Sequence, residues 1–148
     1  MIKHIKCDIF KADADVICHQ VNCQGVMDSG IAKQVREKYP SVFKAYKDLC
    51  DEIGAEALFG AAHFCPINNG KVIANLFAQS DYGYDDKLYT NYNALRFGFE
   101  SVKKHFQNKT IAIPYFIGCY SGGGDWNIVY TMIKEIFENS ENNVLICE

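Results

Sequence analysis

Apolar residues recur at helical spacing in three parts of the chain. They return every three or four positions over residues 42–53, 92–106 and 128–137. This spacing places them on one face of an amphipathic α-helix. Gly54 supplies a stop for the first of these helices, and a fourth helix is predicted over residues 30–39, ended by Pro40.

Six apolar runs of strand length lie around these helices. They cover residues 2–5, 16–21, 61–65, 72–77, 111–115 and 144–147. Several are apolar throughout, as expected for strands covered on both faces, and Asn68-Asn69-Gly70 predicts a hairpin turn between the third and fourth. The order of elements predicts a single α/β domain over residues 1–148. It has three layers, α/β/α, in which the middle layer is a mixed six-stranded sheet.

Composition and charge narrow the classes of partner. The chain is 49% hydrophobic and 22% charged, which is typical of a soluble globular protein. A net charge of −3, with scattered Lys and Arg, argues against general binding to a nucleic-acid backbone. No run reaches membrane-spanning length and no signal-peptide core is present, so no membrane partner is expected.

Cysteine and histidine usage favours a cytoplasmic protein without a metal. The seven cysteines are odd in number and form no C-x-x-C pair, which predicts reduced thiols. The four histidines are dispersed and make no cluster with cysteine. We therefore expect neither a metal site nor a bound cofactor.

Two glycine-containing loops carry the main functional signal. Residues 22–30 read Asn-Cys-Gln-Gly-Val-Met-Asp-Ser-Gly, and residues 117–126 read Ile-Gly-Cys-Tyr-Ser-Gly-Gly-Gly-Asp-Trp. Each loop runs from a strand to a helix start, where backbone amides bind anions without a basic side chain. At neighbouring strand ends, two such loops would clasp a diphosphate. Neither has the Gly-Lys-Ser/Thr of a P-loop or the full pattern of a Rossmann dinucleotide site.

With these motifs in order, the chain resembles the macrodomain family of ADP-ribose-binding modules. The resemblance rests on Cys7-Asp8-Ile9, on residues 19–25 with 29–32, and on residues 113–126. It is nearest to the branch of yeast-type ADP-ribose-1″-phosphate phosphatases and terminal ADP-ribose glycohydrolases. The resemblance implies a macrodomain fold, ADP-ribose or a derivative as ligand, and ADP-ribosylated macromolecules as candidate partners.

The resemblance also assigns ligand contacts. Asp8 would accept a hydrogen bond from the adenine amino group beside the Ile9 amide, and Asn22 would lie near the distal ribose. Asp8 as a turn cap and Asn22 as the start of an Asx-turn are the alternatives. The remaining expected contacts, mostly to the diphosphate, are Gly30, Ile31, Ala32, Ile117, Gly118, Cys119, Tyr120, Ser121, Gly122, Gly123 and Gly124.

His19 is the sharpest catalytic candidate, because phosphatases of this branch carry histidine at the matching place. It would activate water against a terminal phosphate or protonate the leaving ribose oxygen. The alternative is a hydrogen-bonded core histidine. Asp125 would assist as a base or orienting group, or would only cap the helix that follows.

One departure from the family separates the candidate functions. Glycohydrolases of this branch use a lysine shortly after the fourth strand, and some use an aspartate in the second glycine loop. Gln79 and Gly122 occupy these positions here, which disfavours a lysine mechanism. We therefore expect an ADP-ribose-1″-phosphate phosphatase. A non-catalytic reader of free or protein-linked ADP-ribose, and a hydrolase releasing ADP-ribose from protein or nucleic acid, are the alternatives.

Overall fold

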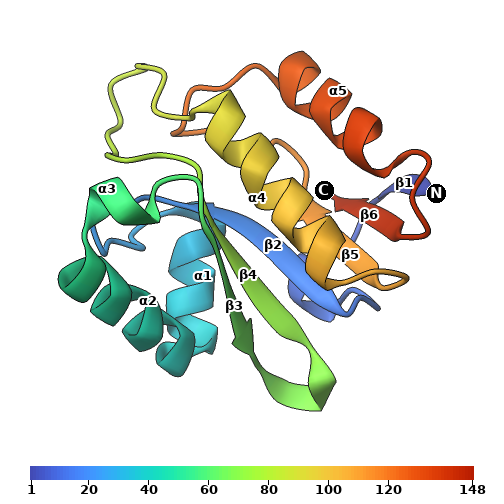
Figure 1. The fold of residues 1–148 in the computed structure, drawn as a ribbon, viewed down its shortest axis with the longest axis horizontal. Coiled ribbons are helices and arrows are strands. Elements are labelled where there is room, and N and C mark those ends of the chain that lie inside the picture. The colour runs from blue at the N-terminus through green and yellow to red at the C-terminus, as the bar shows by residue number, and fades with distance from the viewer.

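A mixed six-stranded sheet forms the centre of the computed structural model, which describes residues 1–148 (Figure 1). The strands are β1 (Ile2–Ile5), β2 (Val16–Val21), β3 (Ala62–Pro66), β4 (Val72–Phe77), β5 (Thr110–Pro114) and β6 (Asn143–Cys147). They are ordered β1-β6-β5-β2-β4-β3, and only β3 runs antiparallel to its neighbour. The predicted strand set and the mixed sheet are confirmed.

Helices cover both faces of this sheet. Figure 1 shows α1 (Gly30–Lys38), α2 (Pro40–Ile53) and α3 (Ala55–Leu58) on one face, and α4 (Tyr92–His105) and α5 (Trp126–Phe137) on the other. Pro40 ends the predicted 30–39 segment and also begins α2, because proline fits the first helical position, where no amide bond is lost. None of the helices has the length and apolar character needed to cross a bilayer.

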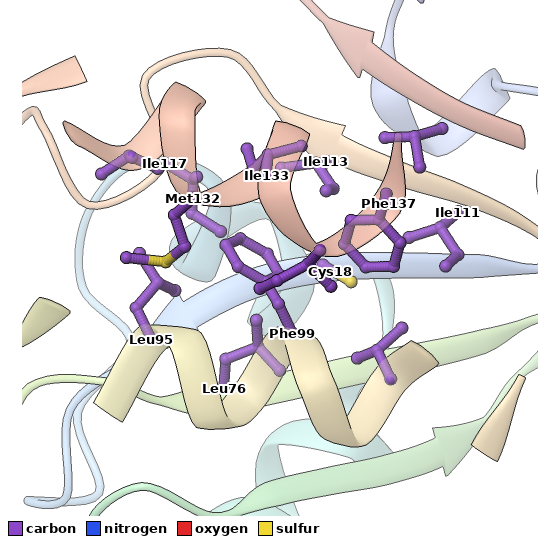
Figure 2. Packing of buried hydrophobic residues seen from close by; sticks show 14 of the residues in the cluster. Cys18, Leu76, Leu95, Phe99, Ile111, Ile113, Ile117, Met132, Ile133 and Phe137 are labelled. Atoms are coloured by element: carbon purple, nitrogen blue, oxygen red, sulfur yellow. The ribbon is translucent and has the colours of Figure 1, made fainter. Parts of the chain in front are cut away.

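The two layers each bury an apolar core against the sheet. Successive β2 side chains point to opposite faces, so that Val16 and Cys18 pack toward α4 and α5, while Ile17 and Val21 pack toward α1 and α2. Figure 2 shows the first core, where side chains from α4 and α5 meet the strands. Burying each large apolar side chain contributes about 1.5–3 kcal/mol.

The predicted turn between β3 and β4 is present. Asn69 has φ 61° and Gly70 has φ 74°, a left-handed pair that Asn and Gly adopt readily. Pro66 ends β3, which lies at the edge of the sheet, where a missing backbone donor breaks no ladder. The short turn therefore holds β3 antiparallel to β4 and leaves the other five strands parallel.

The loops that follow β2, β4 and β5 all leave from the carboxyl ends of these strands, which lie at the same end of the sheet because the strands are parallel. Residues 78–91 form the connection from β4 to α4, and Asn91 N donates to Ala78 O across its base at 2.8 Å. This places a long loop beside both glycine loops, at the strand ends where α/β sheets bind ligands.

Candidate functional site

A pocket of about 490 Å³ opens at the carboxyl ends of these strands. Residues from both glycine loops line it, and so do residues of the 78–91 loop. The predicted ligand residues in its wall are Asn22, Gly30, Ile31, Ala32, Ile117, Gly118, Tyr120, Ser121 and Gly122. The two loops that the sequence predicts to clasp one ligand thus border one cavity.

Asp8, Ile9, Cys119, Gly123 and Gly124 lie outside this wall. Asp8 Oδ1 accepts from Phe10 N at 3.0 Å and caps the short 3-10 turn Ile9–Lys11. The Ile9 side chain is buried in the core beneath α1 and α2. The capping alternative for Asp8 is therefore what the structure contains, and the contact of Asp8 with adenine stays a prediction.

Asn22 holds the first glycine loop in shape. Its Oδ1 accepts from Gln24 N at 2.9 Å, which is an Asx-turn, and from the hydroxyl of the buried Tyr46 at 2.8 Å. Its Nδ2 donates to Val26 O at 2.8 Å. Because these bonds occupy much of the amide, Asn22 serves first to preorganise the loop.

The start of α1 leaves backbone donors free. Ser29 occupies the N-cap position, but its side chain makes no capping bond to the helix. The amides of the first turn, which begins Gly30-Ile31-Ala32, have no intrahelical partner in an α-helix. Free amides at the positive end of a nine-residue helix, in the wall of a pocket, have the chemistry to bind an anion.

Glycine is needed in the second loop because the chain turns tightly there. Gly118 has φ 75° and Gly123 has φ 74°, and Gly124 N donates to Gly118 O at 2.8 Å. A Cβ on Gly122 would come 2.5 Å from Thr90 Oγ1, and one on Gly123 would meet Lys87 O. The loop therefore has no room for side chains at these positions.

Gln20 ties β2 to the 78–91 loop through contacts that the sequence motifs do not predict. Its Nε2 donates to Gln79 Oε1 and to Thr90 Oγ1, each at 2.8 Å. Thr90 Oγ1 in turn donates to Gly118 O at 2.7 Å, which ties the 78–91 loop to the second glycine loop. The available signal is a pair of polar residues, His19 and Gln20, near the end of a strand that is otherwise apolar.

Gln79 lies in the pocket wall, where the branch glycohydrolases are expected to carry lysine. Its Oε1 accepts from Gln20, and its Nε2 donates to Asp81 O at 2.8 Å. A carboxamide held in this way has no amine to attack an opened ribose. The geometry agrees with the expectation that a lysine mechanism is disfavoured.

We expect Thr90→Val to lower the free energy of unfolding by about 1–3 kcal/mol, because it leaves buried polar partners unpaired without changing side-chain shape. Thr90 is 3% exposed and contacts both Gln20 and Gly118. Urea unfolding measures the change. Thr110→Val is the matched control, since the Thr110 hydroxyl makes no hydrogen bond within the chain, and equal stability of the two variants would contradict the role of Thr90.

His19 lies in the pocket wall, but its side chain is almost fully buried, with 1% exposure. Its Nε2 is 2.5 Å from Asn75 Oδ1, and its Nδ1 has no partner. Burial lowers the pKa of His19 to about 4, although the Asn75 bond opposes this shift. His19 is therefore neutral at pH 7, which disfavours the expected role as a proton donor and leaves that of an acceptor.

Asp125 caps α5. Its Oδ1 accepts from Asn127 N at 2.8 Å, and its own amide donates to Tyr92 Oη at 2.9 Å. Asp125 is absent from the pocket wall. These contacts match the capping alternative, and catalysis by Asp125 stays a prediction without a contact to support it.

Two curated relatives match most of the chain. A DNA ADP-ribosyl glycohydrolase of Mycobacterium tuberculosis is 28% identical over 140 residues, which are 93% of this chain and 39% of the relative. An ADP-ribose 1″-phosphate phosphatase of Saccharomyces cerevisiae is 29% identical over 129 residues, covering 82% of this chain and 72% of the relative. No protein-family model matches the chain.

Among solved structures, the macrodomain of Mycobacterium tuberculosis DarG matches with a TM-score of 0.84 and 27% identity, over 99% of this chain and 97% of that chain. The chain has the macrodomain fold. Thermosipho africanus DarTG in complex with ADP-ribose shares the macrodomain fold, with a TM-score of 0.82 and 21% identity over 99% of this chain and 41% of that chain. The macrodomain spans 39% of the length of the glycohydrolase relative.

Aromatic rings support the second loop of the macrodomain. Tyr115, Phe116 and Tyr120 all line the pocket, and Phe116 has φ 64°, which a bulky residue rarely adopts. Phe116 stacks on Tyr115, with ring centroids 4.7 Å apart. Trp126, the first residue of α5, contacts Tyr115 edge-on at 5.0 Å and stacks on Tyr130 at 5.7 Å. These contacts anchor the strained end of the loop to α5.

Proposed function

We propose that this macrodomain, as one domain over residues 1–148, binds ADP-ribose and removes the phosphate of ADP-ribose-1″-phosphate. The observation that carries the binding is that both glycine loops line the same pocket. Free amides at the start of α1 offer donors to a diphosphate from one side. Both named relatives act, by their names, on ADP-ribosyl compounds.

In this proposal the pocket residues determine how ADP-ribose is oriented. The diphosphate lies between the first turn of α1 and residues 117–124, where backbone donors meet. Adenine lies toward Cys147 and Asp8, at the ends of β6 and β1, and the distal ribose lies toward Asn22 and Gln79. Cys147, Asn22 and Gln79 line the pocket, so each end has a wall to contact.

In the proposed reaction, the oxygen of a water molecule bonds to phosphorus while the bond from phosphorus to the C1″ oxygen breaks. The products are inorganic phosphate, which keeps one proton of the water, and ADP-ribose, while the second proton of the water passes to solvent. A neutral His19 accepts a hydrogen bond from the attacking water, since burial keeps its second nitrogen unprotonated at pH 7. Solvent supplies the proton of the leaving oxygen.

Two other functions have an observation in their favour. The near-complete burial of His19 favours a reader that binds ADP-ribose without chemistry. The match to the DNA ADP-ribosyl glycohydrolase over 93% of the chain favours a hydrolase acting on ADP-ribosylated macromolecules. For such a hydrolase, Gln79 requires attack by water rather than by lysine. Seven unpaired cysteines fit a reducing compartment, which supports a cytoplasmic location.

Calorimetry and phosphate release test the proposal in sequence. We expect ADP-ribose to bind, and no binding at millimolar ligand would contradict all three functions. We then expect wild type to release phosphate from ADP-ribose-1″-phosphate, and His19→Gln to release it about a hundredfold more slowly. Equal rates would remove His19 from the mechanism. Binding without release by wild type would leave the reader or the macromolecular hydrolase, which ADP-ribosylated DNA and protein substrates separate.

A further inference from the structure

We infer that Asn75 is a positioning residue that holds His19 in the tautomer with the proton on Nε2, leaving Nδ1 as the acceptor nitrogen. The consequence for turnover rests on the proposed function. The tautomer itself does not, because it follows from hydrogen bonds within the chain. Nothing in the sequence resemblance assigns a role to Asn75.

Strand pairing places Asn75 between two histidines. His19 on β2 is directly opposite Asn75 on β4, and His63 on β3 is opposite Asn75 from the other side. Alternation along each strand puts the three side chains on the face covered by α1 and α2, among apolar neighbours such as Ile73 and Phe77. A row of three polar side chains therefore crosses an apolar layer.

The orientation of the Asn75 amide follows from its two neighbours. Oδ1 faces His19 Nε2 at 2.5 Å, and Nδ2 lies 3.2 Å from His63 Nδ1 and 3.7 Å from Cys65 Sγ. A carbonyl oxygen only accepts, so His19 Nε2 must donate and must carry the proton. The amide nitrogen donates to His63 Nδ1, so both ends of Asn75 are satisfied.

The opposite amide orientation would require both neighbours to change their protonation. It would point an N–H group at His19 Nε2 and so move the ring proton to Nδ1. The His63 bond would also be lost unless His63 changed its own tautomer. The observed orientation therefore goes with one proton arrangement, in which His19 Nε2 donates to Asn75 Oδ1.

The selected tautomer leaves a lone pair at His19 Nδ1. This nitrogen is buried, has no partner in the chain, and belongs to a residue of the pocket wall. A buried acceptor without a partner calls for a donor from outside the chain. A water molecule or a ligand hydroxyl at the distal ribose supplies such a donor, whereas a phosphate oxygen without a proton does not. Asn75 therefore determines which kind of group His19 accepts in the pocket.

The direct test is ¹⁵N nuclear magnetic resonance of the histidine-labelled wild-type protein at neutral pH. We expect the His19 ring to show a protonated Nε2 and a pyridine-type Nδ1. A dominant Nδ1–H form would overturn the inference. In Asn75→Leu, which keeps a similar volume but cannot accept, we expect a mixture of both tautomers. A wild-type tautomer pattern in Asn75→Leu would also overturn it.

Turnover gives a second readout that a merely structural role would not move. We expect Asn75→Leu to lower kcat for ADP-ribose-1″-phosphate about tenfold or more, with nearly unchanged affinity for ADP-ribose, because Asn75 is absent from the pocket wall. Asn75→Asp, which keeps an acceptor for Nε2, should recover part of the rate and shift its pH profile upward, since a carboxylate raises the pKa of His19. Equal losses in both variants would contradict positioning through Nε2.

The two proposals fail separately. If wild type releases no phosphate, the phosphatase proposal fails, and the resonance experiment on wild type still decides the tautomer. If wild type releases phosphate but His19 carries its proton on Nδ1, only the inferred role of Asn75 is contradicted. Circular dichroism of each variant establishes that it is folded before its rate is compared.

Discussion

Gly123→Val should weaken ADP-ribose binding at least about tenfold while affecting adenosine far less. Gly123 has φ 74°, and a Cβ there would meet the backbone oxygen of Lys87 in the 78–91 loop. Because the added Cβ does not fit at the present separation of the two backbone segments, we expect the second glycine loop to shift. The shift would take its amides away from the diphosphate. Calorimetry with both ligands measures the difference, and equal losses would contradict a diphosphate site at this loop.

Gly70→Val is the matched control for this experiment. Gly70 also has φ 74°, but nothing lies within 4 Å of its added Cβ, and it sits in the turn between β3 and β4. It carries a comparable backbone strain without touching either glycine loop. Its stability should fall, while its affinity for ADP-ribose should match that of wild type. A loss of affinity in both variants would indicate general destabilisation instead of a local effect.

The free energy of unfolding should fall by about 3 kcal/mol between about pH 6.5 and pH 4 because of His19 alone. Burial lowers the pKa of His19 to about 4 in the folded protein, against 6.5 for the exposed group. The unfolded chain therefore binds a proton that the folded chain excludes. The contribution is complete above the unfolded pKa and is lost as pH falls through the folded pKa.

Urea unfolding of wild type and His19→Gln over this pH range isolates the effect. His19→Gln keeps a donor for Asn75 and has nothing to titrate, so its stability should depend less on pH. His63, whose pKa burial also lowers, contributes with the same sign in both proteins and cancels in the comparison. Parallel curves for the two proteins would show that His19 is not held neutral by burial.

Strand and helix positions were predictable because the core is layered. Central strands buried on both faces give mostly apolar runs, and β2, β4 and β5 show this pattern, interrupted by His19 and Gln20 in β2 and by Asn75 in β4. The α3 helix was not predicted, since four residues are too few for a helical period to show. Local periodicity describes one element at a time, so it does not predict the order in which the strands pair.

Local motifs predicted the loops of the site better than its long-range bonds. The two glycine loops carry their own signal, and residues of both line the pocket. Gln20 is 59 residues from Gln79 and 70 residues from Thr90, so only the completed sheet brings them together. Asn75 was likewise hidden within an apolar strand. Polar residues inside apolar runs were the signal, and strand register was needed to interpret it.

Trp126 gives this protein a built-in optical probe. It is the only tryptophan of the chain, and its indole ring lies against Tyr115, Phe116 and Tyr130 directly behind the second glycine loop. All indole emission therefore originates from a single place at the base of that loop. Movements of the loop, or the arrival of an adenine nearby, can be followed in unlabelled protein in real time.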